Sequence, residues 1–162
     1  MISEKMNKAI NEQITKELYS AYLYIGMAGY AASVGLGGVA GWFQVQAKEE
    51  LGHATKFMHY LSEQGGTLSL KAIAAPDQKF SSVASLFDKT LEHEKEVTAS
   101  IHALVALAKK EADYATEIFL QWFVTEQIEE ESSVANIIQK LGIGGKGGNS
   151  LLMLDKALAL RK

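Results

Sequence analysis

The breaks in this sequence leave room for long helices and for little else. Its single proline is Pro76, and eleven of its 14 glycines fall in three tight clusters. Because Gly and Pro interrupt regular structure, they divide the chain into segments of about 3–34, 39–64, 81–141 and 149–160. None of these segments shows the apolar–polar alternation of a half-buried strand. The sequence therefore predicts an all-α protein.

The segment 81–141 is too long to be one helix in a chain of 162 residues. We expect a break at Lys109–Asp113, with Asp113 as the N-cap of a new helix. Ser3 and Ser82 are suited to cap the helices that follow them. The prediction is four long helices and a short fifth one.

The connections indicate how these helices are arranged. Short turns join the first helix to the second and the third to the fourth, so each pair runs antiparallel. The connector 66–80 can span about 50 Å when extended, whereas a 26-residue helix is only about 39 Å long. This crossover can therefore make the second and third helices parallel. We expect one domain over 1–162, with a four-helix bundle (about 3–141), a hinge (142–148) and a short helix (about 149–160).

Each long helix has an apolar stripe, at steps of three and four residues, that a carboxylate interrupts near its middle. These carboxylates are Glu17, Glu50, Glu94 and Glu130, and His53 follows Glu50 by three residues on the same face. In the topology above, the last three of these glutamates share one layer. Glu17 is displaced from the layer by about five residues, which we assign to helix tilt and to the uncertainty of helix ends.

A layer of four buried carboxylates is unfavourable by itself. Each buried ion costs several kcal/mol, and close like charges raise one another's pKa. Bound cations remove both problems, and an oxygen-rich ligand set with one imidazole suits iron(II) or manganese(II) better than zinc, calcium or magnesium. One such glutamate alone is typical of a solvated helix face. Four at stripe positions, with an E-x-x-H pair among them, favour a metal centre.

The composition excludes several other classes. The chain has no cysteine, which excludes disulfides, iron–sulfur clusters and thiolate chemistry and suits a reducing compartment. With 16 basic and 19 acidic residues and no basic tail, it is a poor candidate for nucleic-acid binding. No apolar run of 18 residues and no signal peptide are visible. We therefore expect a soluble, cytoplasmic protein that does not associate with membranes.

Four motifs together resemble prokaryotic non-haem ferritins in order and spacing. They are KELYSAYLY (16–24), QAKEELGHATKF (46–57), LEHEKEVT (91–98) and FLQWFVTEQIEEE (119–131). The resemblance covers nearly the whole chain and implies the ferritin-like four-helix bundle. It also implies an iron storage protein with ferroxidase activity, in which two irons within each subunit are oxidised by oxygen or peroxide. Ferric mineral would then be stored in a hollow homo-oligomeric shell of 24 subunits.

The resemblance also assigns roles to single residues. The expected di-iron ligands are Glu17, Glu50, His53, Glu94 and Glu130, with Gln127 beside them. The first three of these residues hold the first iron, and Glu50 bridges to the second. The positions that match a third, nearby iron site in such ferritins are Glu49, Glu126 and Glu129. A run of glutamates is otherwise typical of a solvated face.

Three further residues bear on the chemistry. Tyr24 matches a tyrosine beside the iron site of the family, and it is equally well explained as a core tyrosine with a satisfied hydroxyl. Trp122 is more simply explained by packing. In bacterioferritins a methionine that binds haem follows the bridging glutamate by one position. Leu51 stands there in this chain, so we expect no haem.

Three alternatives compete with a storage ferritin. A rubrerythrin-like di-iron protein that scavenges peroxide carries an extra Cys-ligated iron domain, for which this chain has no cysteines. A small DNA-protecting relative has a basic tail and ligands shared between subunits, and neither is visible. A purely structural bundle has no use for the carboxylate layer.

The segment 149–160 forms a short amphipathic helix with Leu151, Leu154 and Leu158 on one face. A helix of this length is marginal alone, so its leucines need a partner. That partner is either the chain's own bundle or, as the resemblance favours, a symmetry axis where several copies meet.

Overall fold

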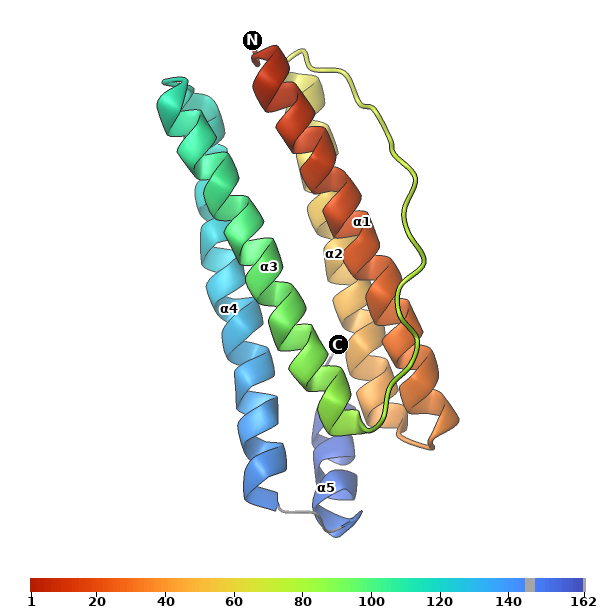
Figure 1. Ribbon diagram of the computed structural model, residues 1–162. Coiled ribbons are helices and arrows are strands. Elements are labelled where there is room, and N and C mark those ends of the chain that lie inside the picture. The colour runs from red at the N-terminus through yellow and green to blue at the C-terminus, as the bar shows by residue number, and fades with distance from the viewer. Residues whose placement is uncertain (145–147, 162) are drawn as a thin grey trace.

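The computed structural model describes residues 1–144 and 148–161. Over these residues the chain forms five helices and no strand, so the all-α prediction is confirmed. The helices are α1 Glu4–Ser33, α2 Gly37–Glu63, α3 Val83–Lys110, α4 Tyr114–Gly144 and α5 Gly148–Leu158. Figure 1 shows α1 to α4 as a bundle with α5 at one end. Within the described residues, no helix combines the length and the apolar character needed to cross a membrane.

The three expected helix caps are present. The Ser3 hydroxyl accepts a hydrogen bond from the Met6 amide at 3.0 Å. Ser82 and Ser85 cap α3 reciprocally, and the Asp113 carboxylate accepts from the Thr116 amide at 3.1 Å. These bonds satisfy amides that a helix start leaves without a partner. The predicted break between α3 and α4 is thereby confirmed.

One extended crossover, 64–82, connects α2 to α3 and follows α1 along the bundle (Figure 1). Two asparagines of α1 hold its first part. Asn7 Oδ1 accepts from the Thr67 amide at 2.9 Å, and Asn11 Nδ2 donates to the Thr67 carbonyl at 2.9 Å. As a result α2 and α3 run parallel, and the expected bundle with one long crossover is confirmed.

Two antiparallel pairs, α1–α2 and α3–α4, build the bundle and meet through large aromatic side chains. Phe57 of α2 stacks on Phe123 of α4 with ring centroids 4.0 Å apart. Phe43 of α2 stacks on Phe87 of α3 at 5.2 Å. The two contacts belong to separate apolar clusters. Between these clusters lies a layer of buried polar side chains, where the sequence predicted the carboxylates.

Two helix ends differ from the expected ones. Helix α2 begins at Gly37 rather than at 39, and α4 continues to Gly144 rather than ending at 141. Helix propensity disfavours glycine by only about 1 kcal/mol, so glycines near a helix end do not stop it. The earlier start of α2 brings Glu50 closer to the level of Glu17. Of the expected hinge, residues 145–147 lie outside the described residues.

Helix α5 packs on its own bundle. Leu154 is buried in the apolar cluster that contains Phe43, and Leu151 and Leu158 pack against the same cluster. Of the two partners considered for these leucines, the structure shows the chain's own bundle. Asp155 Oδ1 accepts a hydrogen bond from the Val39 amide at 2.8 Å. It thereby caps the start of α2, where Leu36 provides no side-chain cap.

Candidate metal centre

Each long helix contributes one carboxylate to the polar layer, as the stripes predicted. Their exposed fractions are 1% for Glu17, 2% for Glu50, 1% for Glu94 and 4% for Glu130. His53 joins them at 5%. Four acidic side chains are therefore withdrawn from water in one layer, which calls for compensating positive charge.

The candidate ligands of the first iron lie close together. Ligand atoms of Glu17, Glu50 and His53 all lie within 4.8 Å of one another. His53 Nδ1 is 3.3 Å from Glu50 Oε2 and 3.9 Å from Glu17 Oε2. Glu17 Oε2 is buried and has no hydrogen-bond partner among the described residues. A buried carboxylate oxygen without a donor fits a metal cation.

The candidate ligands of the second iron, Glu94 and Glu130, accept hydrogen bonds from neighbouring side chains. The Tyr24 hydroxyl donates to Glu94 Oε1, and Gln127 Nε2 donates to Glu94 Oε2 at 3.1 Å. Glu130 Oε2 accepts from Gln46 Nε2 at 2.6 Å. Both oxygens of Glu94 and one oxygen of Glu130 thus accept hydrogen bonds, so a metal bound there competes with these donors.

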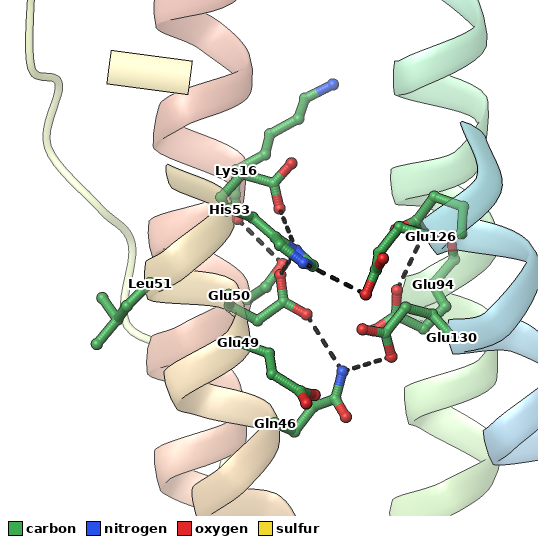
Figure 2. Close-up of polar contacts among 12 residues, drawn as sticks. Lys16, Gln46, Glu49, Glu50, Leu51, His53, Glu94, Glu126 and Glu130 are labelled. Carbon is green, nitrogen blue, oxygen red and sulfur yellow. Dashed lines mark hydrogen bonds and ion pairs between the residues drawn. The ribbon is translucent and has the colours of Figure 1, made fainter. Parts of the chain in front are cut away.

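Two glutamines complete the layer. Figure 2 shows the Gln46 amide between Glu50 and Glu130, and Gln46 Nε2 lies 3.4 Å from Glu50 Oε1. Gln13 Nε2 donates to Glu17 Oε1 at 2.8 Å. The sequence reasoning missed both residues. The signal was available, because each precedes its glutamate by four residues on the same helix face.

Burial and mutual repulsion govern the charges of the site. Burial, with the nearby Glu50 carboxylate, raises the pKa of Glu17 to about 8. Burial, with Glu94, raises the pKa of Glu130 to about 7. The pKa values of Glu50 and Glu94 are also raised, chiefly by burial. Near neutral pH the site without metal thus holds protons that a metal must displace.

The expected third set lines one acidic pocket of about 190 Å³, formed by Glu49, Glu126, Glu129, Glu130, Ser133 and Arg161. Glu126 Oε1 lies 3.9 Å from His53 Nε2 (Figure 2). Ligand atoms of His53, Glu126 and Glu130 come within 4.8 Å of one another, so the pocket adjoins the centre. Glu49 is instead ion-paired with Arg161, which the sequence did not predict.

Three further residues considered in the sequence, Tyr24, Trp122 and Leu51, differ in their relation to the layer. Burial raises the pKa of the Tyr24 phenol well above its ordinary value, so this residue stays a hydrogen-bond donor. Trp122 is 40% exposed, and its ring contacts His53 at 5.6 Å between centroids. Leu51 points away from the cluster (Figure 2) and is 46% exposed.

A four-helix bundle with one long crossover and an inward-facing carboxylate–histidine layer defines a class, the ferritin-like carboxylate metalloproteins. The model of the ferritin-like domain family matches residues 7–142 of this chain. The chain belongs to this family, as its motifs indicated, and iron storage is the function that this membership supports.

Individual ferritins are similar to this chain over nearly its whole length. The chain is 39% identical to the bacterial non-heme ferritin of Campylobacter jejuni, over 96% of this chain and 93% of that protein. It is 37% identical to the bacterial non-heme ferritin of Staphylococcus aureus, over 99% and 97%. The crystal structure of an open pore ferritin from Archaeoglobus fulgidus superposes with a TM-score of 0.99, at 48% identity and full coverage of both chains.

Proposed function

We propose that this ferritin oxidises iron(II) inside each subunit and passes iron(III) to a stored mineral. Glu17, Glu50 and His53 bind the first iron. Glu94 and Glu130 bind the second iron, and Glu50 bridges the two. The observation that carries the proposal is the buried carboxylate layer, in which Glu17 Oε2 accepts no hydrogen bond from any described residue and is suited to bind a cation.

The ligand set supports oxidation as well as binding. Two bound iron(II) ions supply the two electrons that reduce oxygen to hydrogen peroxide, or hydrogen peroxide to water. Anionic oxygen ligands favour iron(III) over iron(II), because the higher charge gains more from them. Because the pKa values of Glu17 and Glu130 are raised, these carboxyl groups hold protons near neutral pH and release them as iron binds.

Gln127 is a positioning residue in this scheme. Its Nε2 donates to both the carbonyl and the carboxylate of Glu94, at 3.2 and 3.1 Å. It stands on α4 where Glu50 stands on α2, but a neutral amide binds iron more weakly than a carboxylate. A weakly held second ion suits a centre that releases its product.

We propose that the chain forms one ferritin-like domain over 1–162 and assembles into a shell of 24 subunits in the cytoplasm. Its oxidant is oxygen or peroxide, and it binds no haem. Glu49, Glu126 and Glu129 bind a third metal ion. A peroxide-scavenging protein of the rubrerythrin kind is not favoured, because the relatives found are named ferritins.

The test is to add iron(II) in air to the purified protein and to follow ferric absorbance together with particle size. We expect rapid oxidation, followed by a particle of constant outer size whose density increases as mineral accumulates inside. Oxidation that stops after two irons per subunit, with no mineral, would favour a di-iron enzyme without storage.

The two iron positions are expected to fill in order. Glu17, Glu50 and His53 lie around an oxygen that accepts no hydrogen bond from the described residues. Glu94 and Glu130, in contrast, must give up hydrogen bonds from Tyr24, Gln127 and Gln46. In crystals soaked with limiting iron(II), the anomalous peak beside His53 should exceed the one beside Glu94. Equal peaks, or a stronger peak at Glu94, would contradict this order.

A further inference from the structure

The acidic pocket beside the metal centre already contains a cation, the guanidinium of Arg161. Its Nη2 is ion-paired with Glu49, and its Nη1 donates to Gln46 Oε1 at 2.8 Å. The guanidinium carbon lies 4.6 Å from the centroid of the Trp42 ring. Three residues of α2 thus hold a planar charged group in one place, as arginine geometry allows.

The docking of α5 on α2 brings Arg161 to this position. Asp155 accepts from the Val39 amide, and Leu154 is buried in the core. At Gly38 an added Cβ would lie 1.8 Å from the Asp155 carbonyl oxygen, whereas at Gly37 it would meet nothing within 4 Å. The close approach of α5 therefore depends on glycine at 38 and not at 37.

Arg161 also connects to the di-iron ligands. Since Gln46 Oε1 accepts from Arg161, its Nε2 is directed toward Glu130 and Glu50. A guanidinium that leaves the pocket frees Glu49 and releases the Gln46 amide at the same time.

Resting on the function proposed above, we infer that Arg161 is a tethered cation that occupies the third metal site and competes with metal for Glu49. Glu49 cannot ligate a metal while it is paired, and a cation in the pocket repels another one. The C-terminal segment therefore determines how tightly this ferritin fills its third site. Metal binds there only when the arginine moves out.

Zn²⁺ is the probe for the test, because it is redox-inert and shares these ligand types. We expect calorimetric titration of the assembled wild-type protein to show two tight sites per subunit and a weaker third one. Arg161→Ala should tighten the third site about tenfold. Arg161→Lys, which keeps the charge, should restore much of the weak binding. Lys156→Ala, which removes an exposed charge from α5, is the matched control and should bind like wild type.

A second pair of variants tests the tether with Arg161 intact. Gly38→Ala should displace α5 and tighten the third site as Arg161→Ala does, whereas Gly37→Ala should not. A third readout needs only the Trp122→Phe protein, in which Trp42 is the remaining tryptophan. Its emission should change as the third Zn²⁺ binds, because the arginine leaves the ring.

Equal third-site affinity in wild type and Arg161→Ala, or no third site in either, would overturn the inference. So would Trp42 emission that stays constant while the third Zn²⁺ binds. Failure of the proposed di-iron centre would look different. In that case Glu50→Ala would leave the two tight sites unchanged, whatever the result at Arg161.

Discussion

Replacing Glu50 by alanine is expected to slow the fast phase of iron(II) oxidation at least about 100-fold. Losing a residue that merely supports a metal ligand commonly costs about 10–100-fold in affinity or activity, and Glu50 is a proposed ligand of both irons. It lies 3.3 Å from His53 Nδ1 and shares the Gln46 amide with Glu130. Stopped-flow absorbance of ferric species, at two irons per subunit, measures the effect.

The fold should tolerate this change, because one of four mutually repelling carboxylates disappears. Glu63→Ala is the matched control, since Glu63 is an exposed glutamate on the same helix, and its oxidation rate should equal that of wild type. Glu50→Gln keeps the size of the side chain and should be nearly as slow as alanine, because the charge is what binds iron. A Glu50→Ala protein that oxidises iron at the wild-type rate would show that the centre is wrongly assigned.

The metal-free protein is expected to lose stability as pH rises from about 5 to 8. Burial and Glu50 raise the pKa of Glu17 from its ordinary 4.5 to about 8, so the folded state binds this proton more tightly than the unfolded chain does. The stabilisation is fully present below pH 4.5 and is lost progressively as pH rises through the folded-state value. At about 1.4 kcal/mol per pKa unit, the loss is on the order of several kcal/mol, and Glu17 shares it with the neighbouring Glu50.

Denaturant unfolding with a chelator present, at pH 5, 6.5 and 8 and one protein concentration, measures this loss. Glu17→Gln should flatten the profile, whereas Glu92→Gln, which changes an exposed glutamate, should leave it unaltered. Saturating Zn²⁺ should reverse the trend, because metal competes with protons and binds better as pH rises. A flat or rising profile for the metal-free wild type would contradict the protonated state of the buried layer.

Helical periodicity was sufficient to predict which acidic side chains are buried in the polar layer. Steps of three and four residues place Glu50 and His53 on the core face wherever the helix begins, and the same holds for the glutamates of the other helices. Depth along the bundle was less certain, because it depends on helix ends. The start of α2 at Gly37 rather than at 39 accounts for part of the displacement of Glu17.

The hydrogen-bond partners of these buried acidic side chains were harder to predict. Gln13 and Gln46 were not among the predicted stripe residues, although each lies four residues before its glutamate on the same helix face. Arg161 could not be found at all from the sequence. Its place depends on where α5 docks, and that follows from a close approach at Gly38 and from the Asp155 cap on α2, which are tertiary contacts between distant segments.

The two helix pairs give the subunit an approximate internal two-fold symmetry with the polar layer at its centre. Glu17 on α1 corresponds to Glu94 on α3, and the E-x-x-H of α2 corresponds to Q-x-x-E on α4. In a perfectly symmetric subunit the two metal positions would be identical, and neither ion would have a reason to leave first. The departures at Gln127 and Glu130 break that equivalence. In the proposed di-iron centre this difference gives a direction to iron transfer, with one position expected to retain its ion and the other to release it.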